Sequence, residues 1–199
     1  LMRKDLSRFA EQAWHVLEPG VPLIWNWGAE AFAEHLSWVT LGQIRFLLVN
    51  VPPRQTKSTL GTVIWPAWEW VSAPGLQFLT GSYTIQLAQR DSRKSRQIIE
   101  SPWYQQRWGH RFKMADDENL KRQFSNDQGG RRVVTSTDAT TTGEGGNRII
   151  LDDPHNAKEV ESDTQRQGVH DWWDNALSSR LNQANVDSWM VVGQRTHEN

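Results

Sequence analysis

Apolar and polar positions follow two different periods along this chain, and the changes of period predict its elements. Apolar residues recur at helical spacing in some stretches and form short continuous runs, typical of buried strands, in others. The expected helices cover residues 3–17, 30–40, 59–71, 82–99 and 158–181. The expected buried strands cover residues 43–49, 76–81, 148–154 and 188–192. Strands that alternate with helices predict an α/β fold with a central, mostly parallel sheet flanked by helices.

Turn and cap residues refine this outline. Ser82 is a candidate cap for the long helix that follows it. Pro66 predicts a kink or an early stop in the helix at 59–71, and Gly168 a break in the last helix. Residues 122–125 and 132–136 flank a Gly-containing loop, which predicts a small β-hairpin inserted in the fold.

Length and composition suit one soluble domain. The 199 residues can bury a sizeable core, and the absence of cysteine excludes a disulfide framework and thiol chemistry. No apolar run approaches the roughly 20 residues of a membrane span, so a cytosolic protein is the default expectation. We expect residues 1–42 to form a helical, Trp-rich region that packs on a core of residues 43–199. Leu1 precedes Met2 and Asn199 follows a predicted strand closely, so both ends are expected to be edges of a longer protein.

Charge is unevenly distributed, although the net charge is only −1. Residues 90–132 contain 11 basic and six acidic side chains, a local charge of +5. Two interpretations stay open: a solvated helix face with its loops, or a basic surface for a phosphate backbone.

The segment from Asn50 to Thr59 carries the first candidate chemistry. It follows an apolar strand, precedes a helix and contains Lys57-Ser58. In a phosphate-binding loop the lysine contacts phosphate oxygens and the hydroxyl contacts Mg²⁺. However, Val51 and Thr56 occupy the two glycine positions of the usual pattern. By itself the segment fits a strand, turn and helix with a surface lysine equally well.

Two further strand ends carry polar residues. Asp152 and Asp153 follow a buried run, and 193–198 follows the last strand. Ligands bind beyond the carboxyl ends of strands in open α/β sheets, so three such ends indicate a common site. Asp152 can hold Mg²⁺ through water and Asp153 can orient an attacking water, provided that the chain turns there. His197 and Glu198 alone are weak evidence for zinc.

In order and spacing, these motifs resemble the N-terminal ATPase domain of a tailed-bacteriophage terminase large subunit, the DNA-packaging motor. Residues 49–58 resemble its degenerate Walker A motif, 149–154 its Walker B motif and 194–198 its coupling motif. Segments 80–83, 87–88, 92–96, 101–104 and 172–180 complete the match, which covers nearly the whole chain. The resemblance implies a P-loop NTPase fold of the ASCE type.

The resemblance also implies roles for individual residues. Catalysis falls to Asp153, Arg54 and Lys57, with Arg54 stabilising charge in the transition state. Ser58 and Asp152 are expected to bind the metal. Gln194, Arg195 and Thr196 are expected to couple hydrolysis to movement. Arg93, Arg96 and Arg148 are candidates for contact with DNA or a neighbouring subunit. The expected nucleotide contacts are Pro53, Arg54, Gln55, Thr56, Lys57, Ser58 and Thr59.

The implied function is ATP hydrolysis, with Mg²⁺, that moves double-stranded DNA into a procapsid. The implied partners are the portal protein, the small terminase subunit and further copies in a ring, expected to be a pentamer. The setting is the bacterial host cytoplasm, transiently at the portal, without a membrane. The family's nuclease domain would follow Asn199, so no DNA cleavage is expected of this chain.

Departures from the family keep alternatives open. Asp153 stands where many relatives have Glu, and its side chain reaches roughly 1.5 Å less. Glu144 occupies a loop where relatives often carry a basic residue for the neighbouring subunit's ATP; Arg148 and the arginines at 90–96 are unranked substitutes. The alternatives are a helicase or recombination ATPase, and a non-catalytic module that binds nucleotide or DNA.

Overall fold

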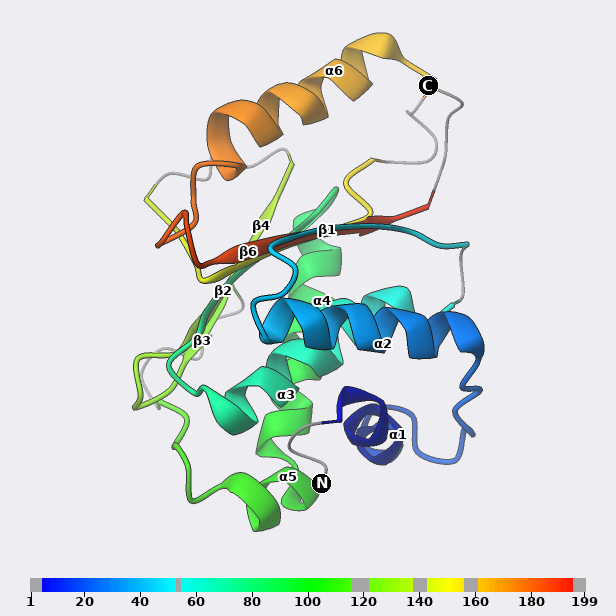
Figure 1. The fold of residues 1–199 in the computed structure, drawn as a ribbon, viewed down its shortest axis with the longest axis vertical. Coiled ribbons are helices and arrows are strands. Elements are labelled where there is room, and N and C mark those ends of the chain that lie inside the picture. The colour runs from blue at the N-terminus through cyan, green and yellow to red at the C-terminus, as the bar shows by residue number, and fades with distance from the viewer. Residues whose placement is uncertain (1–4, 53–54, 116–121, 138–142, 156–160, 195–199) are drawn as a thin grey trace.

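The computed structural model describes residues 5–52, 55–115, 122–137, 143–155 and 161–194. Its centre is a six-stranded sheet with the order β1-β6-β5-β2-β4-β3 (Figure 1). The strands are β1 (Phe46–Asn50), β2 (Gln77–Ser82), β3 (Gln123–Ser125), β4 (Arg131–Ser136), β5 (Arg148–Asp152) and β6 (Ser188–Gly193). Neighbouring strands from β1 to β4 run parallel, and only β3 is antiparallel to its neighbour. The mostly parallel sheet and the β3–β4 hairpin confirm the expected fold class.

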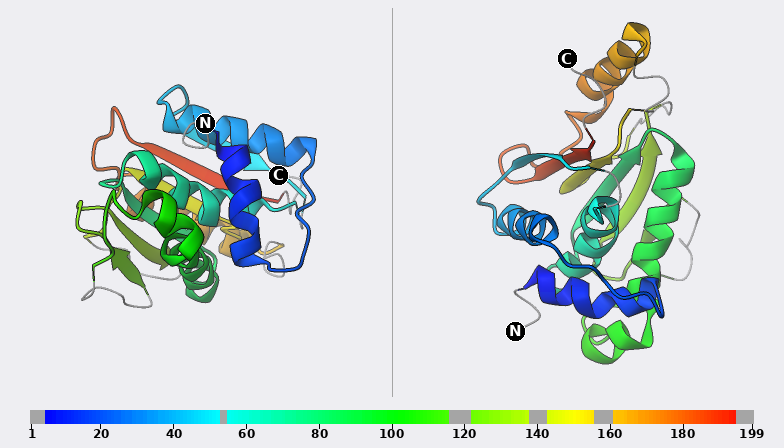
Figure 2. Two further views of the ribbon diagram at one scale, coloured as in Figure 1. Left: turned by 90° about the horizontal axis from the view of Figure 1, so that it is seen from below. Right: turned by 90° about the vertical axis from the view of Figure 1, so that its right-hand side faces the viewer.

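Helical segments cover both faces of the sheet unequally. They are α1 (Leu6–Leu17), α2 (Trp27–Thr40), the π-helical η2 (Thr59–Ile64), α3 (Trp65–Ser72), α4 (Ile85–Glu100), α5 (Pro102–Trp108), α6 (Asp163–Trp172) and the π-helical η3 (Trp173–Leu177). Figure 2 shows α6 on one face of the sheet and the earlier helices on the other. The main hydrophobic cluster lies under α1 to α5, and a smaller one lies between the sheet and η3.

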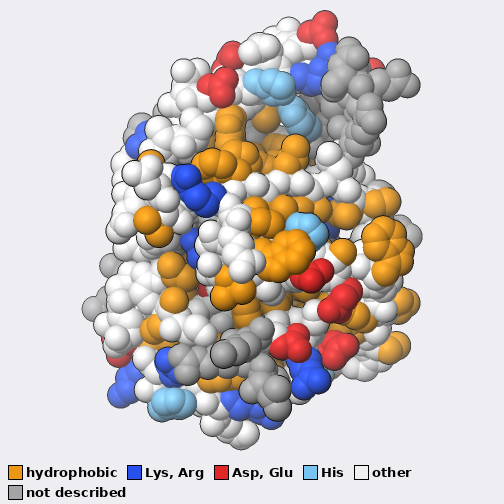
Figure 3. Space-filling view, viewed as in Figure 1, with side chains coloured by type: hydrophobic (Ala, Val, Ile, Leu, Met, Phe, Trp, Pro, Cys, Tyr) orange, Lys and Arg blue, Asp and Glu red, His pale blue; other side chains and the backbone are white. Residues whose placement is uncertain are grey.

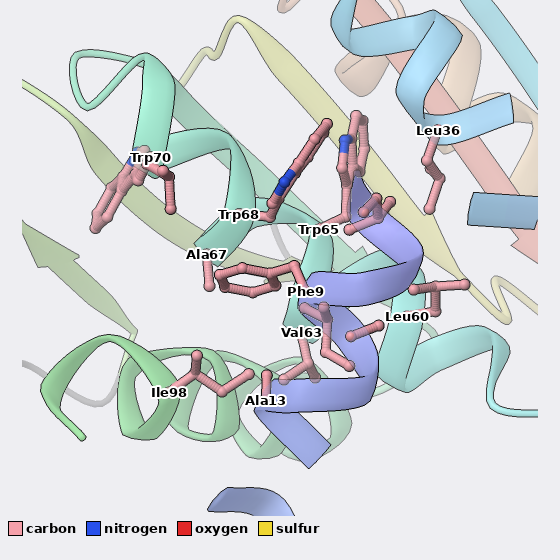
Figure 4. Packing of buried hydrophobic residues seen from close by; sticks show 14 of the residues in the cluster. Phe9, Ala13, Leu36, Leu60, Val63, Trp65, Ala67, Trp68, Trp70 and Ile98 are labelled. Atoms are coloured by element: carbon pink, nitrogen blue, oxygen red, sulfur yellow. The ribbon is translucent and has the colours of Figure 1, made fainter. Parts of the chain in front are cut away.

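Tryptophans dominate the main cluster. Trp65 and Trp70 of α3 are 0% and 1% exposed. Phe9 of α1 lies close to Ala67 of α3 (Figure 4). Each indole finds a hydrogen-bond acceptor: Trp65 Nε1 donates to Thr40 Oγ1 at 2.9 Å, and Trp70 Nε1 to the Leu76 carbonyl at 2.9 Å. Large aromatic side chains bury much apolar area, and a satisfied N–H removes the cost of burying their polar atom. The region 1–42 thus shares one core with the rest of the chain.

The helix after β1 does not stop at Pro66. Instead, η2 begins it with π-helical hydrogen bonding, and Pro66 occupies the first turn of α3. A proline is tolerated there because its missing N–H is one that a first turn leaves unpaired. The Trp65 N–H bonds the Leu60 carbonyl, five residues back, so the wider π turn carries the chain into α3.

The predictions for Ser82 and Gly168 were wrong. Ser82 is the last residue of β2 instead of a cap, and Thr84 occupies the N-cap position of α4. Gly168 lies inside α6 without breaking it, because helical hydrogen bonds continue on both sides. A glycine costs an exposed helix only about 1 kcal/mol, less than the neighbouring turns contribute together.

The edge of the sheet at β1 leaves an apolar surface. Phe46 and Leu48 are 48% and 66% exposed, and the Phe46 ring stacks on Trp189 of β6 at 4.8 Å. Figure 3 shows hydrophobic side chains gathered in this band, between α6 and α2. None of the helices in the described ranges has the length and apolar character that crossing a bilayer requires.

A buried ion pair joins α3 to the middle of the sheet. Arg148 at the start of β5 donates to both carboxylate oxygens of Glu69, at 3.0 to 3.2 Å. Burial raises the pKa of Glu69, against the lowering effect of the Arg148 charge and of hydrogen bonds from Arg148 and Thr40. Two neighbouring donors and a positive charge therefore offset the cost of placing a carboxylate at 1% exposure.

Breaking this pair should destabilise the fold strongly. Arg148→Met leaves Glu69 as an unpaired buried charge, so the free energy of unfolding should fall by about 3–5 kcal/mol. The double variant Glu69→Leu/Arg148→Met should recover most of that loss, because no charge then stays buried. Denaturant unfolding monitored by circular dichroism measures each value.

The matched control is Arg96→Met, which breaks the exposed Arg96–Glu100 pair of α4. It should cost less than about 1 kcal/mol. Equal effects of Arg148→Met and Arg96→Met would show that burial of the Glu69–Arg148 pair does not matter to stability.

Candidate functional site

The three polar strand ends lie side by side. The sheet order places β6 between β1 and β5, so these three strands present adjacent carboxyl ends. Asn50 pairs with Gly193, and Asp152 pairs with Val192 in the same parallel register. The convergence expected from the sequence is therefore a property of this sheet.

Lys57 is the centre of the site. It lies at the start of the helical segment after β1, and it is only 6% exposed. Its ammonium forms an ion pair with the Asp153 carboxylate and lies 3.8 Å from Asp152 Oδ1. An ammonium taken out of water needs such opposite charges. The carboxylates from the end of β5 therefore neutralise the charge of this lysine.

A turn in the backbone brings both carboxylates to one lysine. Successive side chains of a strand point to opposite faces, but Asp153 adopts φ of +42° and leaves the strand direction. Its N–H donates to the Val192 carbonyl at 2.8 Å, and its carbonyl accepts from the Tyr83 N–H at 3.3 Å. Asp tolerates this left-handed region better than most residues. The turn expected at the end of this strand is thus present.

Asp152 has a carboxylate oxygen, Oδ1, that could bind a cation. Burial raises its pKa to about 6, and the Ser58 hydroxyl and the Lys57 charge act in the opposite direction. Its Oδ1 is buried and accepts no hydrogen bond in the described part of the chain. A buried carboxylate oxygen without a donor, next to a serine hydroxyl, suits Mg²⁺ with its bound water. Ser58 and Asp152 therefore fit the metal expected from the sequence.

Thr56 adopts a backbone conformation that usually requires glycine. Its φ is +56°, the left-handed conformation that glycine usually provides at this position. The other substituted position, Val51, needs no such freedom, because its N–H continues the ladder to the Gly193 carbonyl at 3.0 Å. The two positions without glycine thus hold one threonine in the left-handed region and one valine that follows β1 directly and extends its hydrogen bonding to β6.

Comparison with known proteins rests on structure alone. No model of a known protein family matches the sequence, and no curated protein does either. The crystal structure of the bacteriophage HK97 large terminase matches with a TM-score of 0.54 and 12% identity, over 96% of this chain. The fold is that of a phage large terminase.

The match covers only 37% of the HK97 protein, so the chain spans little more than a third of that length. The large terminase ATPase domain of Thermus phage P74-26, in a mutant form, matches at a TM-score of 0.46 and 15% identity. This second match covers 75% of the present chain and 59% of the other.

One further loop residue, Gln55, connects the site to α2. Gln55 is exposed, and its Oε1 accepts from the Asn26 side chain at 2.8 Å, while Asn26 Oδ1 caps α2 at the Ala29 N–H. Thr59 begins η2. Pro53 and Arg54 lie outside the described residues. Asn26 was not anticipated from the sequence, because nothing local indicates that a helix cap 29 residues earlier contacts this loop.

The third strand end is described in part. Gln194 follows β6 and is half-buried, whereas Arg195 and Thr196 lie outside the described residues, as do His197 and Glu198. Gly193 lies beside Asp153, since a Cβ atom there would meet Asp153 Oδ1 at 3.5 Å. Within the described ranges, no three His, Asp or Glu side chains cluster so as to hold a metal alone.

The three arginines proposed for DNA or subunit contact differ in exposure and in ion pairing. Arg93 of α4 is exposed and makes no ion pair in the described ranges, so it is available to a partner. Arg96 is paired with Glu100 at 2.8 Å. Arg148 is a correction to the expectation, since it is 8% exposed and bound to Glu69, which leaves it no access to a phosphate backbone. Glu144, in the loop considered for a basic residue, pairs with Arg131 at 3.1 Å.

Glycine at position 56 should relieve strain. The left-handed conformation costs a non-glycine residue about 1–2 kcal/mol, whereas glycine adds about 0.4–1 kcal/mol of unfolded-state entropy. Thr56→Gly should therefore raise the free energy of unfolding by up to about 1 kcal/mol. Thr56→Ala, which removes the same hydroxyl but keeps the strain, should not. Denaturant unfolding of both variants checks this, and equal stability of the two would contradict the assigned backbone strain.

Proposed function

We propose that this chain is an ATP-hydrolysing motor domain that drives double-stranded DNA into a viral procapsid. The observation that carries the proposal is the buried ammonium of Lys57 between the carboxylates of Asp152 and Asp153. A loop lysine beside strand-end carboxylates supplies the groups that P-loop NTPases use, the lysine for phosphate and a carboxylate for Mg²⁺. The large-terminase fold then favours DNA packaging over other uses of the same chemistry.

In this proposal, Lys57 exchanges its ion pair with Asp153 for phosphate oxygens. Mg²⁺, when bound, neutralises phosphate charge. Ser58 and the free oxygen of Asp152 hold the cation and its water shell, in keeping with the position of both groups. Asp153, released from Lys57, orients the attacking water. Arg54 stabilises charge in the transition state, and Pro53, Gln55, Thr56 and Thr59 complete the phosphate contacts.

Coupling to movement would pass through the end of β6. Because β6 lies between the strands that end in Asn50 and Asp152, a change at either neighbour reaches Gly193 first. Gln194, Arg195 and Thr196 follow directly and would transmit the state of the nucleotide. The proposed partners are double-stranded DNA, the portal, the small terminase subunit and further copies in a pentameric ring. The setting is the host cytoplasm.

Lys57→Ala should abolish turnover. Loss of a charged hydrogen-bond donor costs about 1.5–3 kcal/mol, so Mg·ATP affinity should fall about 10- to 100-fold. Calorimetric titration measures the binding, and phosphate release measures the turnover. The matched control is Lys94→Ala, which removes another partly buried, ion-paired lysine, bound to Glu18 at 2.9 Å. Turnover that survives Lys57→Ala would refute the assignment, as would equal losses in both variants.

Arg93→Ala should weaken DNA binding without changing Mg·ATP affinity. One phosphate contact contributes about −0.9 to the slope of log affinity against log salt, so the slope should become shallower by about one. Fluorescence anisotropy with a DNA duplex at several salt concentrations measures this. Arg8→Ala removes an exposed arginine of α1, paired with Asp5, and should leave the slope unchanged. An unchanged slope in Arg93→Ala would remove Arg93 from the DNA surface.

A further inference from the structure

A buried carboxylate lies behind the phosphate-binding loop, on α4. Asp91 is 6% exposed, and its oxygens accept two hydrogen bonds from Arg90, from Nε at 2.8 Å and from Nη2 at 3.2 Å. This fork-shaped contact matches the geometry in which arginine also binds phosphate. The Arg90 side chain is 49% exposed, so it has room to move, whereas Asp91 is enclosed.

Contacts connect this pair to the loop itself. Thr62 Oγ1 donates to the Ser58 carbonyl at 2.6 Å and lies 3.4 Å from Asp91 Oδ2. Ser58 is in turn the hydroxyl residue beside Asp152. The hydrogen bonds to Asp91 raise the pKa of Arg90 most, and the negative charges of Asp91 and, to a smaller extent, Asp152 act in the same direction.

A second arginine supports the same carboxylate from the interior. Arg132 of β4 is 1% exposed, and its three guanidinium nitrogens have no hydrogen-bond partner in the described part of the chain. Burial lowers the pKa of Arg132 to about 10, while the charge of Asp91 acts in the opposite direction. Asp91 therefore contacts one partly exposed arginine, Arg90, and its charge also acts on the enclosed Arg132.

We propose that Arg90 is a mobile cation of the phosphate site, stored on Asp91 in the nucleotide-free protein and transferred to the γ-phosphate during hydrolysis. Arg132 then balances the charge of Asp91. This inference rests on the proposed ATPase function and adds a residue to it. It also ranks the arginines of α4 and β5, since Arg96 is held by Glu100 and Arg148 by Glu69.

The test separates ground-state binding from transition-state binding. Mg·ADP and Mg·ADP with aluminium fluoride, a mimic of the transferred phosphoryl group, are titrated into wild type, Arg90→Ala and Arg8→Ala. Arg8→Ala is the matched control, because it also removes a helical arginine paired with a nearby aspartate. Arginines that stabilise this transition state are worth roughly 10³–10⁵ in rate, so Arg90→Ala should bind the mimic at least 100-fold more weakly. Its affinity for Mg·ADP should stay within threefold of wild type.

Arg90→Lys adds a second readout. Lysine keeps the positive charge but cannot make the two parallel hydrogen bonds of a guanidinium, so affinity for the mimic should return only in part. Equal affinity of wild type and Arg90→Ala for the mimic overturns the inference and leaves the proposed function intact. Equal losses for Mg·ADP and the mimic also overturn it, because they would show general phosphate binding or lost structure. If wild type binds neither ligand, the proposed function itself fails.

Discussion

The burial of one ammonium group constrains the whole site. Lys57 is 6% exposed, and a charge in that position must be neutralised by neighbouring groups. Asp152 and Asp153 provide that neutralisation, because Asp153, directly after β5, adopts φ of +42° and turns its carboxylate toward the lysine. Gly193, at the end of β6, lies beside Asp153, at the distance of an ordinary van der Waals contact. Removing the lysine would leave two neighbouring carboxylates without the cation that neutralises them, so this contact joins the loop after β1 to the turn after β5.

The interior continues this pattern of paired charges. Glu69 and Arg148 join α3 to β5, while Asp91 binds Arg90 and its charge acts on the enclosed Arg132. Each carboxylate is buried and each has a guanidinium near it, as burial of charge demands. The basic character of residues 90–132 is therefore only partly a surface property. Several of its arginines neutralise carboxylates, and Arg93 is the clearest candidate left for a nucleic-acid backbone.

The sheet and the position of the site could be predicted from the sequence, because both follow from local pattern. Apolar runs mark β1, β5 and β6, and parallel strands that end in polar loops must present those loops at one edge. The left-handed backbone of Thr56 and the π-helical turn before Pro66 could not, since the residue types in this stretch are equally compatible with an ordinary turn and α-helix. Arg148 was misassigned for a related reason: its partner Glu69 lies 79 residues earlier, and charge alone does not reveal burial.

The most direct test of the central claim is a structure of the chain with Mg²⁺ and a non-hydrolysable ATP analogue. The account predicts that the Lys57 ammonium leaves Asp153 and contacts the β- and γ-phosphates, with Mg²⁺ between Ser58 and Asp152. An intact Lys57–Asp153 ion pair, with the analogue bound elsewhere or not at all, would contradict it.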